Sequence, residues 1–125
     1  MDQSGASLAL SRALVALAGI ALMSATVVRA QDGEENRLGR GEQVFAQWCA
    51  TCHSDAPAMP GTQALQAKYN GSVSAVLLER SDLTAELISF YVRNGVSVMP
   101  HFRKTEIGDD DLTALAAYIV ETANQ

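Results

Sequence analysis

The chain has 125 residues and a net charge of −5, from nine Lys and Arg against fourteen Asp and Glu. This length holds one ordinary compact domain at most, and the acidic balance argues against a basic surface that would bind nucleic acid. Aromatic residues make up 6% of the sequence, and no repeat or low-complexity stretch is present, which excludes solenoid and collagen-like architectures.

Residues 1–30 have the features of a secretory signal peptide. They carry few charges and contain an apolar run over residues 13–23. They end in Val28-Arg29-Ala30, which has small residues at the positions that a signal peptidase recognises before it cleaves. The apolar stretch is shorter than the ~20 residues that a membrane-spanning helix needs. We therefore predict cleavage after Ala30, export to the periplasm and no membrane span in the mature chain.

The rest of the chain is predicted to be one helical domain behind a short tail. Residues 31–38 are polar and charged, which predicts a flexible N-terminus. Residues 39–125 contain apolar residues at helical spacings, and no segment alternates as a strand does. The fold class predicted for residues 39–125 is all-α.

The first predicted helix starts near Gly41. Val44, Phe45 and Trp48 follow at spacings that place the two rings on one face, and the helix is expected to end near Ala50.

A loop and a short helix are expected in the middle of the chain. Residues 54–61 contain two of the three prolines and are predicted as a loop. Residues 62–69 are predicted as a short helix that stops at Asn70-Gly71, and the apolar run over residues 73–78 fits no single element.

Two amphipathic helices are predicted in the last third of the chain. The first has Asp82 or Thr84 as its N-cap and Gly95 as its stop. Its apolar face comprises Leu83, Leu87, Ile88, Tyr91 and Val92. The second begins with three aspartates, which favour the positive end of a helix. Its apolar face comprises Leu112, Leu115, Ala116 and Ile119.

The residues that carry chemistry form one motif, Cys49-Ala50-Thr51-Cys52-His53. The C-x-x-C-H spacing places two thiols where they can add to the two vinyl groups of a haem, and the next residue offers an imidazole to the iron. Only two Cys and two His are present in the chain, so three of them within five residues make a strong signal.

The same cysteines allow two other interpretations. A thioredoxin-like thiol-disulfide oxidoreductase also begins with a Trp before its Cys pair, here Trp48 before Cys49 and Cys52. That fold requires a βαβ context, whereas the residues before Trp48 have helical period. A zinc site that uses His53 and His101 lacks the usual ligand spacing.

An iron held by His53 needs a ligand on its other face, and Met99 is the predicted one. It lies far enough along the chain to cross over the haem, whereas Met59 follows His53 too closely and sits in the proline loop. His101 is the rival, expected near the surface. Thioether ligation raises the reduction potential, which suits an electron acceptor.

With these residues the chain resembles the class I c-type cytochromes over residues 39–123. In that family pattern, Gly41 and Phe45 of the first helix pack against Leu115 and Tyr118 of the last. The resemblance implies a cytochrome c-like fold with short helices around one covalently bound haem c, and terminal helices that pack crosswise.

The resemblance also implies a proline whose carbonyl accepts the Nδ1 hydrogen of the iron-binding His53. Pro60 is the first candidate and Pro57 the alternative. Such a bond would orient the imidazole and raise its basicity.

The stretch from Val92 to Phe102, with Met99-Pro100 inside it, is similar to the cytochrome subunits of flavoprotein dehydrogenases of the p-cresol methylhydroxylase type. The middle segment over residues 64–82 is longer than in those subunits. The resemblance implies a carrier of single electrons, from a flavoprotein dehydrogenase or oxidase to a downstream oxidase or cytochrome.

Such a carrier needs no catalytic residue. Trp48, Tyr69 and Arg93 are candidates for contacts with the haem pocket or its propionates, against the simpler interpretations as a core residue, a loop anchor and a helix C-terminal cation. Docking is expected to be apolar. Its predicted rim comprises Met59, Val96, Val98 and Phe102.

Overall fold

The computed structural model describes residues 33–125. The predicted signal peptide and the cleavage position after Ala30 lie outside the described residues. Residues 36–125 form one compact unit. Within the described part of the chain, no helix has both the length and the apolar character needed to cross a membrane.

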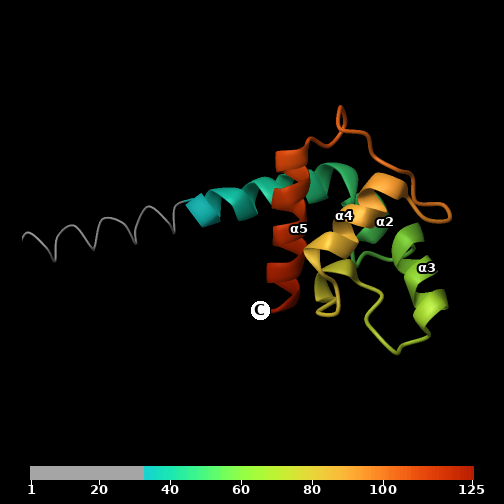
Figure 1. Ribbon diagram of the computed structural model, residues 1–125. Coiled ribbons are helices and arrows are strands. Elements are labelled where there is room, and N and C mark those ends of the chain that lie inside the picture. Colours follow the sequence, from blue (N-terminus) through green and yellow to red (C-terminus); the bar gives the residue numbers. More distant parts are fainter. Residues whose placement is uncertain (1–32) are drawn as a thin grey trace, which may run out of the picture. The chain divides into compact units, whose positions relative to one another are not determined.

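Helices account for the regular structure in residues 33–125 (Figure 1). The described residues contain no strand, only an isolated bridge between Val96 and Met99, which confirms the all-α prediction. The elements in chain order are a helix over residues 33–48, α2 (Ala50–His53), α3 (Pro60–Tyr69), the 3-10 helix η1 (Leu77–Glu79), α4 (Ala85–Asn94) and α5 (Asp109–Ala123).

The first helix crosses α5 where Gly41 has no side chain (Figure 1). A Cβ at Gly41 would overlap the Ala114 carbonyl and lie 2.6 Å from the Tyr118 Cβ, so only glycine permits this approach. Beside the crossing, the rings of Phe45 and Tyr118 lie 5.9 Å apart at 55°. The predicted crosswise packing of the terminal helices is confirmed.

The hydrophobic core lies where these helices meet α4. Its largest fully buried side chains are Ile107, Leu115 and Ile119. The core cluster also includes Val44, Phe45, Ile88, Val92, Leu112 and Ala116. Burial of this apolar cluster stabilises the unit, by ~25 cal/mol per Å² of apolar surface removed from water.

The boundaries of α4 follow from its caps. Thr84 is the N-cap and its hydroxyl accepts a hydrogen bond from the Leu87 amide at 3.3 Å, while Gly95 ends the helix with φ +69°. Ile88 and Val92 are buried as predicted. Leu87 is not part of the core: it is 38% exposed because it lies on the outer side of the helix.

Two boundaries differ from the sequence prediction. Residues 33–38 are helical, whereas we predicted a flexible tail over 31–38, because good helix formers such as Glu and Arg let the first helix extend beyond its buried face. The helix α3 begins at Pro60, because proline is suited to the first helical position, and it ends at Asn70 in the left-handed conformation.

The middle segment is fixed by a buried charge. Arg80 is 4% exposed and binds both carboxylate oxygens of Asp82 at 2.6 Å. Its guanidinium also lies 4.5 Å from the centre of the Tyr69 ring. These contacts join the end of α3 to the approach to α4.

Candidate cofactor site

The C-x-x-C-H motif lies at a break between two helices. Cys49 interrupts the first helix and caps α2, and its carbonyl accepts hydrogen bonds from the amides of Cys52 at 3.0 Å and His53 at 2.9 Å. Both cysteines are free thiols, with Cys49 half-buried and Cys52 exposed. The single turn of α2 therefore gathers two thiols and an imidazole in a short, ordered segment.

Burial sets the protonation of these groups. Burial, together with the nearby Cys52, raises the pKa of the Cys49 thiol to about 12. Burial also lowers the pKa of His53, so the imidazole is neutral at pH 7, which is the form that binds a metal. A redox-active cysteine has a lowered pKa. The protonated Cys49 and the helical context disfavour the thioredoxin-like alternative.

One nitrogen of His53 is buried without a partner. The Nδ1 atom has no hydrogen-bond acceptor, so the bond to the Pro60 carbonyl expected from the resemblance is not formed here. The residue next to Pro60 does lie against the ring: a Cβ at Gly61 would be 2.9 Å from Nδ1. Gly61 is not among the site residues predicted from the sequence, where its one signal is a glycine directly after a proline in the loop beyond the motif.

Met99 lies at the end of a tight turn. The Val96 amide donates to the Met99 carbonyl at 3.1 Å, and the Met99 amide donates to the Val96 carbonyl at 2.9 Å. Gly95 permits the turn, since a Cβ there would lie 2.7 Å from the Met99 carbonyl oxygen. The half-buried Met99 packs against the same core cluster as Cys49, although the two are far apart in sequence.

The rival iron ligands occupy different surroundings. His101 is exposed, as expected. Met59 is the N-cap of α3 and lines a cavity of about 420 Å³ that also borders on Thr62, Gln66 and Val76. None of Cys49, Cys52, His53 and Met99 lines this cavity.

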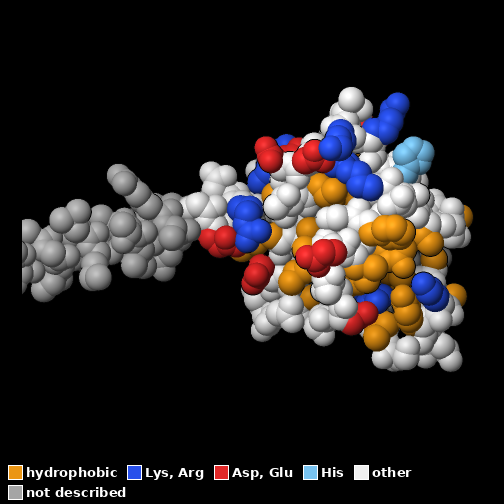
Figure 2. Space-filling view, viewed as in Figure 1, with side chains coloured by type: hydrophobic (Ala, Val, Ile, Leu, Met, Phe, Trp, Pro, Cys, Tyr) orange, Lys and Arg blue, Asp and Glu red, His pale blue; other side chains and the backbone are white. Residues whose placement is uncertain are grey.

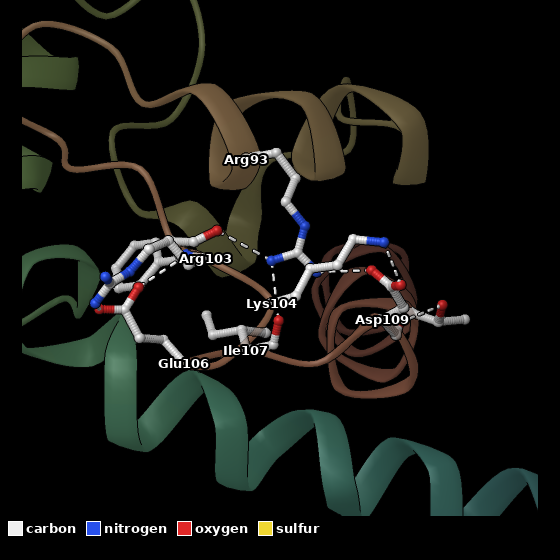
Figure 3. A network of polar contacts seen from close by, with 8 residues as sticks. Arg93, Arg103, Lys104, Glu106, Ile107 and Asp109 are labelled. Atoms are coloured by element: carbon white, nitrogen blue, oxygen red, sulfur yellow. Dashed lines mark hydrogen bonds and ion pairs between the residues drawn. The ribbon is translucent and has the colours of Figure 1, made fainter.

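Arg93 has a role in the scaffold (Figure 3). Its guanidinium donates to the carbonyls of Phe102 at 3.1 Å and Ile107 at 2.9 Å, and to the Asp109 carboxylate at 3.0 Å. Lys104 binds the other oxygen of Asp109 at 2.7 Å. The donors of Arg93 are thereby directed at the segment between Met99 and α5, which supports the interpretation of Arg93 as a structural cation.

The other two pocket candidates also have local roles. Trp48 packs against the core, and its ring meets that of Phe102 edge-on at 5.9 Å, so the end of the first helix touches the segment after Met99. The Lys68 ammonium lies 5.0 Å and the Arg80 guanidinium 4.5 Å from the centre of the Tyr69 ring, and the Tyr69 carbonyl accepts from the amide and hydroxyl of Ser72. These contacts agree with the core and loop-anchor interpretations.

Comparison with known proteins identifies the family. The sequence profile of the family described as cytochrome c oxidase, cbb3-type, subunit III matches residues 36–119. The chain belongs to the c-type cytochromes. This family binds haem c covalently and transfers electrons, so the chain is an electron-transfer protein and not an enzyme.

Curated relatives agree with this membership. The cytochrome c6 of Picosynechococcus sp. is 34% identical over 84 residues, which cover 66% of this chain and 71% of that protein. The cytochrome c6 of Cyanidioschyzon merolae is 32% identical over 89 residues, which cover 70% of this chain and 77% of that protein. No solved structure matches the chain significantly.

The residues of the site fit haem c. The two free thiols have the spacing of haem attachment, and the neighbouring imidazole is neutral, with a buried nitrogen that lacks a partner. In residues 33–125, no three His, Cys, Asp or Glu side chains are grouped in a way that could hold a metal ion.

Proposed function

We propose that this cytochrome is an exported, periplasmic carrier of single electrons, reduced by a flavoprotein dehydrogenase or oxidase and oxidised by a downstream oxidase or cytochrome of the respiratory chain. The observation that carries the proposal is the C-x-x-C-H turn, with free thiols at Cys49 and Cys52 beside the neutral His53. Export is supported by the signal-like sequence of residues 1–30.

Each residue of the proposed site has a separate task. Cys49 and Cys52 would hold the haem through two thioether bonds, and His53 and Met99 would bind its iron. When the haem is bound, the Pro60 carbonyl would accept the Nδ1 hydrogen of His53, a bond that is not formed in the structure described above. We favour Pro60 over Pro57 because Gly61, the residue bonded to Pro60, already lies against Nδ1. When bound, the haem supplies an iron that cycles between Fe(III) and Fe(II).

Two features of the chain support outer-sphere transfer. Met99 is held by backbone hydrogen bonds in a turn against the core, which fixes the point from which its side chain extends. With His53 and Met99 both bound to the iron, no position would remain open for oxygen.

The proposed docking surface is apolar. Val96 is 48% exposed and Val98 82% exposed, both in the turn before Met99, and Phe90 of α4 is 57% exposed. Figure 2 shows hydrophobic side chains gathered over α4 and toward α3 on the viewed face. A dry contact of this kind brings a partner close to the proposed ligand and releases quickly, which suits a carrier.

The ligand assignment is tested with Met99→Ala in protein matured in a host that attaches haem c. We expect loss of the red-edge absorption from Met ligation and a lower potential, with the haem still covalently bound. The matched controls Met59→Ala and His101→Ala should keep that absorption. An unchanged spectrum in Met99→Ala would disprove the assignment.

The donor class is tested by anaerobic mixing with a reduced flavoprotein dehydrogenase that oxidises a p-cresol-type phenol. We expect rapid, saturable reduction of the haem, slowed by Val98→Asp, which places a charge in the proposed contact. Slow reduction with no dependence on Val98 would contradict the flavoprotein proposal but leave the carrier function standing.

A further inference from the structure

The first turn of α3 lies directly on the haem-attachment turn. Thr62 donates its hydroxyl hydrogen to the Ser54 carbonyl at 2.8 Å, in a partly buried position. Gly61 approaches even more closely: a Cβ there would lie 2.7 Å from the Cys52 carbonyl oxygen and 2.7 Å from His53 Cε1. One turn of α3 thus contacts the residues before, at and after the proposed iron ligand.

The absence of a side chain at Gly61 is required by this contact. Real Cβ atoms do not approach backbone oxygens or ring atoms this closely, so any larger residue must displace either α3 or the imidazole. Gly61 lies in a helix, and its backbone does not require a positive φ. The reason for a glycine is therefore the space beside His53.

Little else fixes α3 against the motif. The helix contains no buried residue, and its N-cap, Met59, makes no side-chain capping bond. At its first turn, α3 contacts the motif through the close approach at Gly61 and the hydrogen bond of Thr62, while Tyr69 at its far end contacts Arg80. A movement of this turn would be transmitted to the ring of His53, the first side chain it touches.

We propose that Gly61 and Thr62 are positioning residues that set the orientation of the His53 imidazole on the iron, a role that rests on the proposed axial ligation by His53. Gly61 bounds the ring on its Nδ1 and Cε1 edge, and Thr62 fixes the distance between α3 and the motif. The pair tunes the reduction potential through the ring orientation and through the acceptor that Nδ1 meets.

The first test is Gly61→Ala, with Gly39→Ala as control, because a Cβ at Gly39 meets nothing within 4 Å. Holoprotein is compared by EPR g values of the oxidised form, which report the orientation of axial ligands, and by potentiometry. We expect changed g values and about a tenfold change in the ratio of oxidised to reduced protein at fixed potential, about 59 mV for one electron. Gly39→Ala should match the wild type in both.

The second test keeps the proposal falsifiable if Gly61→Ala fails to fold. Thr62→Val removes the hydroxyl at constant shape, while Thr62→Ser retains it. We expect Thr62→Val to shift the g values and potential in the direction of Gly61→Ala, and Thr62→Ser to restore both. Thr113→Val, which removes a similar bond to the Asp109 carbonyl in α5, is the distant control.

The outcomes separate the two proposals. A wild-type holoprotein whose EPR spectrum excludes His–Met ligation contradicts the proposed function. Wild-type His–Met ligation, with Thr62→Val and any folded Gly61→Ala identical to wild type in g values and potential, contradicts the positioning role alone. A change in melting temperature without a change in these two readouts also contradicts it.

Discussion

The two halves of the compact unit are held together in different ways. The first helix, α4 and α5 share a core whose side chains interdigitate, with Leu115 and Ile107 fully buried. The two short helices beside the motif have less of it: α2 and α3 contain no buried residue, although Ala50 of α2 packs against the edge of that core. Beside the motif, position depends on single polar bonds, such as Thr62 to Ser54, and on close backbone contacts.

This difference indicates what the cofactor contributes. A small domain with a limited core commonly needs a disulfide, metal or cofactor for stability. A group that binds only the folded state stabilises that state relative to the unfolded chain. The helix core gives a scaffold of its own, whereas α2 and α3 contain no buried residue and would gain apolar contacts from a large covalently bound ring. We therefore expect haem to order mainly α2 and α3.

Removal of the cofactor has the largest expected effect. In Cys49→Ala/Cys52→Ala, which cannot attach haem, amides of α2 and α3 should exchange almost as fast as unstructured chain, while those of the first helix and α5 keep part of their protection. Hydrogen exchange with mass spectrometry measures this, with the holoprotein as control. Equal loss of protection in both parts would contradict the expectation that haem orders mainly α2 and α3.

A matched pair of core substitutions compares the halves directly. Leu115→Ala removes a fully buried side chain and should lower the free energy of unfolding by about 2–5 kcal/mol. Leu65→Ala, in α3, removes a half-buried one and should cost about 1 kcal/mol. Denaturant unfolding of the holoprotein measures both, and similar costs would show that α3 has a tighter core than described.

The buried charge of the middle segment gives a smaller effect. Asp82→Asn leaves Arg80 buried without its carboxylate, which should cost about 1–2 kcal/mol. This is the low end for a charged hydrogen bond, because Asp82 is 46% exposed and partly screened by solvent. Glu121→Gln, an exposed change elsewhere, should leave stability unaltered. A cost no larger than that of this control would mean that Tyr69 alone holds Arg80.

Acid gives the smallest effect. Hydrogen bonds from Lys104, Arg40 and Arg80 lower the pKa of Asp109, Asp111 and Asp82 respectively. Because the folded-state pKa lies below the unfolded one, these pairs stabilise the protein above the unfolded pKa and are lost as pH falls through the folded pKa. Asp111→Asn should flatten the acid limb of a melting-temperature profile slightly, and an unchanged limb would show that the pair with Arg40 contributes nothing.

Local pattern was sufficient for much of this protein. The C-x-x-C-H motif, the helical periodicity and the caps at Thr84 and Gly95 depend on neighbouring residues, and the structure agrees with the helices they predict. Gly41 and Tyr118 were placed together through the family pattern, since sequence spacing alone does not say which helices cross. The motif also predicted haem c, the cofactor that membership of the family supports.

Contacts between distant segments were decided only by the tertiary structure. Leu87 fits the apolar period of α4 yet faces outward, because the neighbouring elements cover only the side with Ile88 and Val92. The guanidinium of Arg93 is directed at the Phe102 carbonyl because the chain turns back after Met99. Likewise, glycine is required at position 61 only because α3 packs against His53. The sequence shows that this residue has no side chain, but only the tertiary structure shows that the His53 ring and the Cys52 carbonyl lie where a Cβ would be.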